Sequence, residues 1–148
     1  MSEQHLTIGW REWVSFPQLG IPAIKTKVDT GARTSCLHTS QFEIVQKDGI
    51  DWVNFIIHPL TSEDTPEIHC SAPVLDYREV SDSGGHRQNR PFIRAKMQIG
   101  QHLHEVDLSL TNREGMKFRM LLGRTALSGA FLVDVSQNYL IGTKPSLS

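Results

Sequence analysis

The 148-residue sequence has only two cysteines and no long apolar run. Cys36 and Cys70 are too few for a disulfide-rich secreted scaffold. No stretch approaches the ~18 apolar residues that indicate a membrane span. The first residues also lack the basic and then apolar pattern of a secretory signal. We therefore expect a cytoplasmic protein whose two cysteines are free thiols.

An excess of charge of one sign is missing as well. Fifteen Lys and Arg residues against sixteen Asp and Glu residues give a formal net charge of −1. A chain that binds nucleic acid or an anionic membrane through its overall charge is usually strongly basic. We therefore expect neither a nucleic-acid nor a membrane partner. The length and the 39% hydrophobic content fit one globular domain over residues 1–148.

Many short strand-like segments are present. Between Ile24 and Val28, apolar and β-branched residues alternate with lysines, which is the pattern of a half-buried strand. Arg124 to Gly129 is the one convincing helix. The sequence therefore predicts an all-β, closed or partly open barrel with one short C-terminal helix. The other predicted strands cover residues 6–13, 42–46, 51–58, 77–80, 92–99, 103–110, 118–122, 131–135 and 139–141, with 68–77 ambiguous because of Pro73.

The most suggestive chemical motif is Asp29-Thr30-Gly31, directly after the strand that ends at Val28. A carboxylate in a tight Thr-Gly turn at a strand end is how an aspartic protease presents its catalytic acid. Asp and Gly are also ordinary turn residues, so a simple turn remains the alternative. A second element, residues 120–124 (Met-Leu-Leu-Gly-Arg), precedes the predicted helix and strengthens the catalytic interpretation.

The order of these elements resembles one subunit of a retroviral-type aspartic protease: a strand, Asp-Thr-Gly-Ala, a glycine-bearing hairpin, and Leu-Leu-Gly-Arg before a helix. More closely, the chain is similar to a bacterial family labelled ATP-dependent zinc protease and now grouped with the retropepsins. That likeness runs from Ile8 to Gly142 and is strongest at residues 8–12, 27–35 and 90–93. It implies a retropepsin-type barrel, with an insertion relative to retroviral subunits around residues 42–77.

The resemblance also implies roles for individual residues. This chain has one Asp-Thr-Gly, whereas the mechanism needs two carboxylates, so a homodimer would supply the second Asp29. The implied catalytic residues are Asp29, Thr30 and Gly31; the implied substrate-binding residues are Ala32, Arg33, Ser83, Gly84 and Gly85; the implied supporting residues are Leu121, Leu122, Gly123 and Arg124. For the glycine-bearing hairpin, an exposed turn without a role is the alternative to a mobile flap.

The substrate expected from the resemblance is a peptide or protein that is rich in acid. Retroviral enzymes follow Asp-Thr-Gly-Ala with acidic residues, but Arg33 stands here, and His86, Arg87 and Arg90 lie on the presumed hairpin. Cations in these positions would favour carboxylate side chains, although solvated surface charges are the alternative. The departure also leaves Arg124 without an obvious partner. The resembling family is associated with an ATP-grasp ligase that adds glutamates to a ribosomal protein, which makes such acidic tails candidate substrates.

The sequence contains no motif for binding the ATP or the zinc that the family label names. It has no Gly-x4-Gly-Lys-[Ser/Thr] loop and no His-Glu-x-x-His pattern. His102 with His104, and His69 with Cys70, lack further ligands at a readable spacing. We therefore expect no cofactor and no metal. Two alternatives to the peptidase are a non-catalytic peptide-binding domain on the same fold and a metal-dependent hydrolase.

Overall fold

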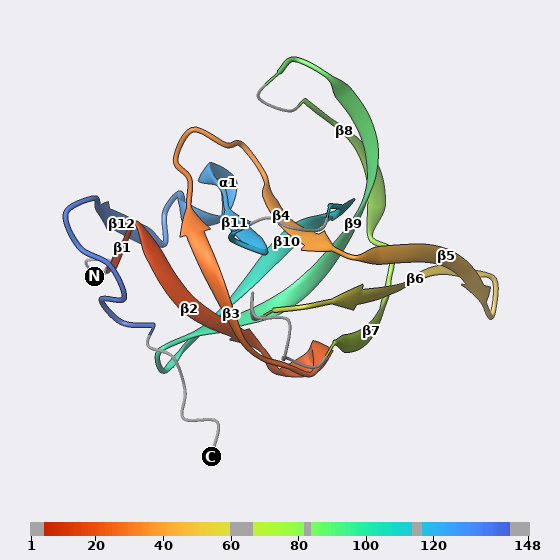
Figure 1. Cartoon of the computed structure of the whole chain (residues 1–148), viewed down its shortest axis with the longest axis horizontal. Coiled ribbons are helices and arrows are strands. Elements are labelled where there is room, and N and C mark those ends of the chain that lie inside the picture. Colours follow the sequence, from red (N-terminus) through yellow and green to blue (C-terminus); the bar gives the residue numbers. More distant parts are fainter. Residues whose placement is uncertain (1–4, 60–66, 82–83, 114–116, 143–148) are drawn as a thin grey trace.

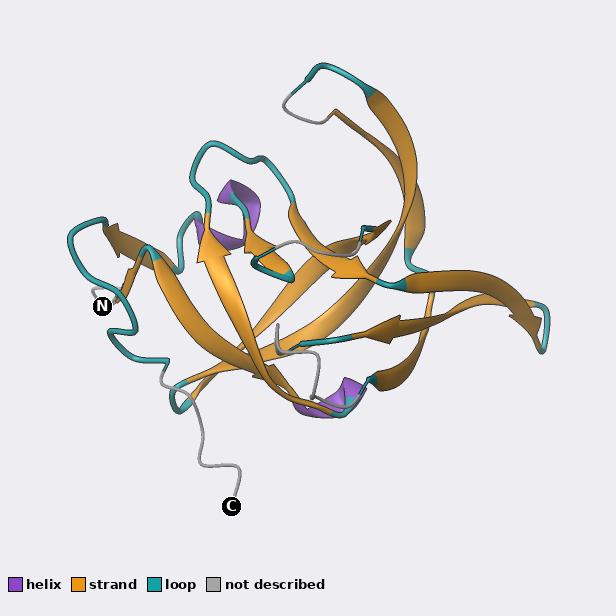
Figure 2. Cartoon of the chain, viewed as in Figure 1, coloured by secondary structure: helices purple, strands orange, loops and turns teal. Residues whose placement is uncertain are grey.

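The computed structural model describes residues 5–59, 67–81, 84–113 and 117–142. Strands dominate these residues, with one short α-helix and one 3₁₀ turn (Figure 2). In chain order the elements are β1 (Leu6–Gly9), β2 (Arg11–Phe16), η1 (Pro17–Leu19), β3 (Ile21–Val28), β4 (Ser35–Thr39), β5 (Gln41–Lys47), β6 (Ile50–Ile57), β7 (Ile68–Pro73), β8 (Asp76–Ser81), β9 (Arg87–Ile99), β10 (His102–Asn112), β11 (Met120–Leu122), α1 (Arg124–Leu127) and β12 (Phe131–Asp134).

The centre of the molecule is a closed barrel with the strand order β2–β3–β11–β4–β10–β9. The pairing of Ser15 with Gln98 joins β2 to β9 and closes the ring. The short strand β11 runs parallel to β3 on one side and antiparallel to β4 on the other. Its insertion brings residues near position 122 beside the end of β3, almost a hundred positions earlier in the chain. The predicted all-β barrel with one short helix is confirmed.

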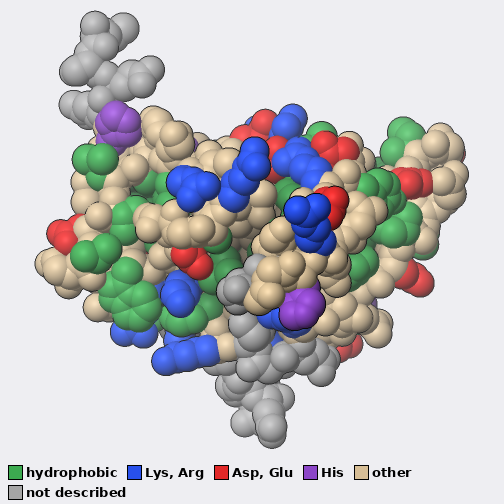
Figure 3. All heavy atoms as spheres, turned by 90° about the horizontal axis from the view of Figure 1, so that it is seen from above, with side chains coloured by type: hydrophobic (Ala, Val, Ile, Leu, Met, Phe, Trp, Pro, Cys, Tyr) green, Lys and Arg blue, Asp and Glu red, His purple; other side chains and the backbone are tan. Residues whose placement is uncertain are grey.

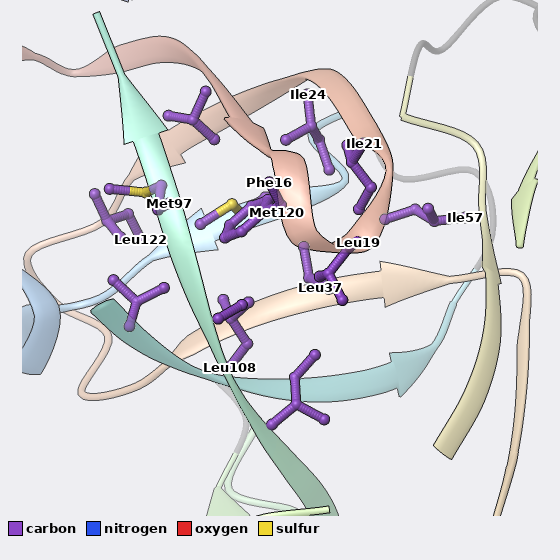
Figure 4. Packing of buried hydrophobic residues seen from close by; sticks show 14 of the residues in the cluster. Phe16, Leu19, Ile21, Ile24, Leu37, Ile57, Met97, Leu108, Met120 and Leu122 are labelled. Atoms are coloured by element: carbon purple, nitrogen blue, oxygen red, sulfur yellow. The ribbon is translucent and has the colours of Figure 1, made fainter. Parts of the chain in front are cut away.

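Alternating side chains fill the barrel (Figure 4). On β9, Ile93, Ala95, Met97 and Ile99 are buried in the core cluster. On β3, the predicted alternation also holds, because Ile24 and Val28 belong to this cluster while Lys27 is exposed. Figure 4 shows side chains from distant strands, such as Phe16, Leu37 and Met120, meeting in the same interior. Each fully buried side chain of this size contributes roughly 1.5–3 kcal/mol, so the core holds the barrel together.

Strands β5, β6 and β7 form a separate antiparallel sheet in that order, which extends to the side of the barrel (Figure 1). Its inner end is attached to the core by Phe55, Ile57 and Ala72. Its outer end is the turn between β5 and β6, where Gly49 has a φ of +77°. This sheet accounts for most of the segment in which we expected an insertion.

A long hairpin of β8 and β9 rises from the barrel and curls over its upper edge in Figure 1. The two strands pair from Asp76 with Phe92 to Ser81 with Arg87. The loop that follows β3 lies at the same edge in this view (Figure 1). No helix within the described segments is long and apolar enough to cross a membrane.

The structure corrects some of the predicted elements. Residues 35–39 form strand β4, which is not among the strands predicted from the sequence. The predicted strand at 139–141 is absent, because the backbone N–H groups of Leu140 and Ile141 are bonded to a side chain instead of a strand. The first predicted strand is divided into β1 and β2 at Trp10, and α1 ends at Leu127, two residues before the predicted end.

Candidate active site

Asp29 lies immediately after β3 in a turn fixed by backbone hydrogen bonds. Its N–H donates to the carbonyl oxygen of Leu122 at 2.9 Å, and its carbonyl oxygen accepts from the N–H of Ala32 at 3.2 Å. The side-chain Oδ1 accepts from the N–H of Gly31 at 3.0 Å. The carboxylate is only half-buried. The backbone is therefore well fixed, while much of the carboxylate remains open to solvent.

Gly123 lets the β11–α1 junction approach this turn closely. A Cβ atom at position 123 would lie 2.5 Å from the carbonyl oxygen of Thr34 and 3.0 Å from that of Ala32. The N–H of Gly123 donates to Ser35 Oγ at 2.9 Å, and the N–H of Arg124 donates to the carbonyl oxygen of Ala32 at 2.7 Å. Only a residue without a side chain fits between these groups. The Asp29 turn and the Leu-Leu-Gly-Arg element, expected to act together, are thus in direct contact.

The two leucines of this element face opposite sides of β11. Leu122 is fully buried in the core, whereas Leu121 is half-buried and pairs with Cys36 on β4. Leu122 also accepts the hydrogen bond from the Asp29 N–H through its carbonyl oxygen. Leu122 therefore supports the turn from the core, and Leu121 lies on the outer face beside it.

Thr30 and Arg124 lie in a shallow groove of about 400 Å³ next to the turn. Its remaining lining comes from the end of α1, the residue that follows it and β12: Leu127, Ser128, Phe131, Leu132 and Val133. Thr30, Arg33 and Arg124 are all exposed. Within the described segments, neither guanidinium group forms an ion pair. Thr125 braces the backbone here, donating from its N–H and its Oγ1 to the carbonyl oxygen of Arg33 at 3.1 and 2.9 Å.

The glycines predicted for the flap lie at the tip of the β8–β9 hairpin. Gly84 and Gly85 are exposed, and Gly85 has a φ of +82°, which favours glycine. Ser83, also predicted to bind substrate, lies outside the described residues. The hairpin and the Asp29 turn project from the same edge of the barrel (Figure 1). The role of this hairpin as a flap stays a prediction.

The sequence interpretation missed a buried polar cluster on the outer face of β4 and β10. His38 Nδ1 lies 2.7 Å from Thr111 Oγ1, and Cys36 Sγ lies 3.7 Å from the same hydroxyl. Burial, together with the nearby charges of Arg113, Arg90 and Arg119, lowers the pKa of His38 to about 4. Burial also raises the pKa of the Cys36 thiol. The alternation of Leu37 with Cys36 and His38 was the available signal, but it is visible only once residues 35–39 are taken as a strand.

A second missed feature is the buried carboxylate of Glu12. Its Oε2 accepts from the N–H groups of Gly9 at 2.6 Å and Leu140 at 2.9 Å. Its Oε1 accepts from the N–H groups of Ile141 at 3.1 Å and Gly142 at 2.7 Å. The side chain is fully buried and ties the C-terminal segment to β2. Nothing local in the sequence indicates donors that lie 128 to 130 positions away.

The candidate metal ligands are dispersed. His69 Nε2 lies 3.0 Å from Glu67 Oε1, while Cys70 Sγ donates to the carbonyl oxygen of Leu19 at 3.3 Å on the buried side. His104 packs against the ring of Phe131. Among the residues that the structure describes, no group of three or more His, Cys, Asp or Glu side chains is placed to hold a metal ion. Both cysteines are free and buried.

Comparison with known proteins agrees with this geometry. The profile of the RimB-like family, described as retropepsin-like aspartic endopeptidase RimB, matches residues 7–144. The chain belongs to this family. A crystal structure of a protein of unknown function from Legionella pneumophila superposes with a TM-score of 0.75 at 20% identity, covering 93% of this chain and 98% of that one. At this identity, the superposition shows a shared fold and nothing about function.

Curated relatives carry a different name. A probable alpha-L-glutamate ligase of Shewanella pealeana is 42% identical over 147 residues, which is 99% of this chain but 32% of the relative. A protein of the same name from Desulfotalea psychrophila is 41% identical over 135 residues, or 91% of this chain and 29% of the relative. The chain thus spans about a third of the length of these relatives. The RimB-like chain is similar to one part of them, and their name describes the longer protein.

Proposed function

We propose that this RimB-like chain is an aspartic peptidase that acts as a homodimer, with Asp29 of each subunit forming one catalytic pair. The observation that carries the proposal is the Asp29 turn. Its backbone is clamped by Leu122 and Gly123, while its carboxylate is half-buried and accepts only the turn's own Gly31 N–H among the described residues. General acid–base chemistry requires a carboxylate that is held by a fixed backbone and still has lone pairs free to bind water and substrate.

The second carboxylate in this proposal comes from a second copy of the chain. The groove beside Thr30 supports such pairing, because it adjoins the turn and is lined mainly by apolar side chains of α1 and β12. Leu132 is 55% exposed and Val135 is 77% exposed next to it. A two-fold axis near Thr30 would bury these side chains and bring the two turns together.

The proposed reaction is the addition of water to an amide bond. One ionised carboxylate takes a proton from the water while the water oxygen bonds to the carbonyl carbon. The other carboxyl group, protonated, donates to the carbonyl oxygen as the tetrahedral intermediate forms. Transfer of a proton to the amide nitrogen then breaks the C–N bond and releases a carboxylic acid and an amine. Two adjacent carboxyl groups share one proton between them, which is the proton that these reaction steps need.

The proposed substrate contains α-linked glutamates. The ligase name of the longer relatives suggests that this domain works on the same kind of linkage that a ligase would make. Lys and Arg side chains gather across the middle of the upper face, with some acidic side chains among them (Figure 3). A cationic face beside the cleft would attract and orient a polyanionic peptide.

The test is cleavage of a peptide with an α-linked glutamate tail by wild type, Asp29→Asn and Asp48→Asn. Asp48 is exposed in the distant β5–β6 turn with a φ of +55°, which Asn tolerates, so this variant is the matched control. We expect Asp29→Asn to lose at least about a thousandfold in kcat/KM, and Asp48→Asn to retain full activity. Mixing wild type with excess Asp29→Asn should also lower activity below the additive value, because mixed dimers lack one carboxylate.

Three outcomes would reject the proposal. Equal activity of wild type and Asp29→Asn would remove the aspartic mechanism. Inhibition by a chelator that added zinc reverses would favour a metal-dependent hydrolase. Binding of the tail without cleavage by wild type, on a protein that stays monomeric at assay concentration, would favour a peptide-binding domain.

A further inference from the structure

Cys36, His38 and Thr111 form a polar cluster on the outer face of β4 and β10, close to the Asp29 turn. We call this cluster the polar floor. Cys36 pairs with Leu121, and the next residue of β11, Leu122, accepts the hydrogen bond from the Asp29 N–H. Cys36 and His38 alternate with Leu37, which points into the core. The face that carries Cys36 and His38 is therefore the one opposite the core, one strand position from the anchor of the turn.

This floor contains a buried hydrogen-bonding atom that the described residues leave unsatisfied. His38 is only 5% exposed, and its Nε2 has no hydrogen-bond partner there. Its Nδ1 lies 2.7 Å from Thr111 Oγ1. When Nδ1 accepts from this hydroxyl, the ring proton lies on Nε2, which is then a buried donor without an acceptor. Unsatisfied buried donors are rare in native proteins and commonly mark the position of a bound group.

Three arginines surround the floor. Arg90 Nη1 lies 4.0 Å from Cys36 Sγ. Arg119 precedes β11 and accepts from the His38 N–H through its carbonyl oxygen at 2.8 Å, while the Arg113 N–H donates to Thr39 at 3.0 Å. The Nε of Arg119 is a second buried donor without a described partner. All three positive charges are close enough to His38 to influence its titration.

These arginines differ from three other arginines, which lie on β8 and β9. Arg78 and Arg94 pair with Asp107, and Arg87 pairs with Glu79. Arg90, Arg113 and Arg119 form no ion pair with any carboxylate in the described part of the chain. Surplus positive charge around this buried polar cluster fits an anionic group that binds from outside.

We propose that Cys36, His38 and Thr111, with Arg90, Arg113 and Arg119 around them, form the subsite that binds a glutamate side-chain carboxylate of the substrate. We call this group the arginine subsite. The assignment rests on the proposed peptidase function. It adds the residues that would make the same cleft prefer glutamate side chains. Carboxylate oxygens accept hydrogen bonds only, so they match the donors of His38, Arg119 and Arg90.

The other chemistry that Cys36 and His38 suggest is a thiol nucleophile with a histidine base. The shifts in both groups oppose it. Burial raises the pKa of the Cys36 thiol, and burial with the three arginines lowers the pKa of His38. A thiolate–imidazolium pair requires the reverse of both shifts. The cluster is therefore suited to binding a carboxylate and not to nucleophilic catalysis.

The first test measures discrimination between substrates. A glutamate-tail peptide and the same peptide with one Glu replaced by Gln beside the cleavage site are compared by kcat/KM in wild type, Arg113→Gln, Arg119→Gln and Arg94→Gln. Loss of a positive charge beside the bound carboxylate, and at Arg119 also of a hydrogen-bond donor, should reduce the Glu/Gln preference by about 10–100-fold in the first two variants. Arg94→Gln removes the same charge from an arginine paired with Asp107 and should leave the preference unchanged. Arg113 is exposed, so its variant should fold even if Arg119→Gln does not.

The second test does not depend on activity. In the Asp29→Asn protein, NMR titration of His38 is followed with and without a tetraglutamate peptide and its Gln-containing analogue. A bound carboxylate stabilises the charged imidazolium, so tetraglutamate should raise the pKa of His38 from about 4, and the analogue should raise it less. No change in His38 together with an unchanged Glu/Gln preference in both arginine variants would overturn the subsite. The proposed peptidase would survive that result, because it is decided by Asp29→Asn activity alone.

Discussion

Two carboxylates on neighbouring strands of the barrel have opposite surroundings. Glu12 on β2 is fully buried and accepts four backbone N–H groups. Asp29, just beyond β3, is half-buried and accepts only from Gly31 of its own turn within the described residues. A carboxylate with all its lone pairs engaged by fixed donors contributes to stability, whereas one with open lone pairs can meet water and substrate. Both residues are acidic, so residue type does not distinguish a structural carboxylate from a candidate catalytic one. The number of fixed hydrogen-bond donors around each carboxylate does.

The largest expected effect is on stability at Glu12. Glu12→Ala leaves four backbone N–H groups without their acceptor and should lower the free energy of unfolding by about 3–5 kcal/mol. Asp29→Ala removes one exposed hydrogen bond and should cost less than about 1 kcal/mol. Urea denaturation at a single protein concentration measures both, so that dimerisation does not distort the comparison.

Glu12→Gln refines this prediction. Each carboxylate oxygen of Glu12 accepts two N–H groups, so an amide nitrogen in either position faces two donors. The near-isosteric change should therefore cost about half as much as Glu12→Ala. Wild-type stability of Glu12→Gln would show that the four hydrogen bonds are not what holds the C-terminal segment.

An intermediate effect is expected at Gly123, where the Asp29 turn meets the α1 junction. A methyl group at this position collides with the carbonyl oxygens of Thr34 and Ala32. Gly123→Ala should cost about 1–3 kcal/mol of stability and displace the turn, so activity should fall further than stability. Ser35→Ala removes only the hydrogen bond to the Gly123 N–H and is the matched control. If the two variants lost activity equally, steric exclusion at Gly123 would not be the reason for the glycine.

The contrast between Asp29 and Glu12 also explains what could be predicted from the sequence. The Asp29 turn and its partner element were predictable because each is a compact local motif at the end of a strand. Glu12 was not predictable, because three of its four donors come from residues 140–142. Those same hydrogen bonds are the reason that the predicted strand at 139–141 does not form.

Strand β4 was missed for a different reason. Its five residues are all buried, and Ser35, His38 and Thr39 are polar. Buried polar residues satisfied by tertiary partners, such as Thr39 Oγ1 donating to the Thr111 carbonyl oxygen at 2.8 Å, give no strand signal in composition. The proposed arginine subsite lies on this strand, so the sequence indicated Arg90 as a candidate cation of the cleft but not Arg113, Arg119 or the polar residues of β4.

The smallest effect is expected at Asp107. This carboxylate accepts more hydrogen bonds than Asp29, but its donors are arginine side chains and not the backbone N–H groups that surround Glu12. Arg94 Nε donates to its Oδ1 at 2.8 Å and Arg78 Nη2 donates to its Oδ2 at 3.3 Å. The hydrogen bond from Arg94 holds the pKa of Asp107 below its ordinary value of 3.8. A lowered pKa in the folded state stabilises the fold above the ordinary value, and this contribution is lost as the pH falls through the lowered one.

Asp107→Asn should therefore reduce the melting temperature by a few degrees at most near neutral pH, because the partners are largely exposed and screened by solvent. The difference from wild type should vanish well below the ordinary pKa of 3.8 and shrink in high salt. Thermal denaturation across this pH range measures it. A difference that persisted in acid would mean that Asp107 contributes through packing and not through its charge. It would then resemble Glu12, whose contribution is set by the geometry of its neighbours, more than an exposed ion pair.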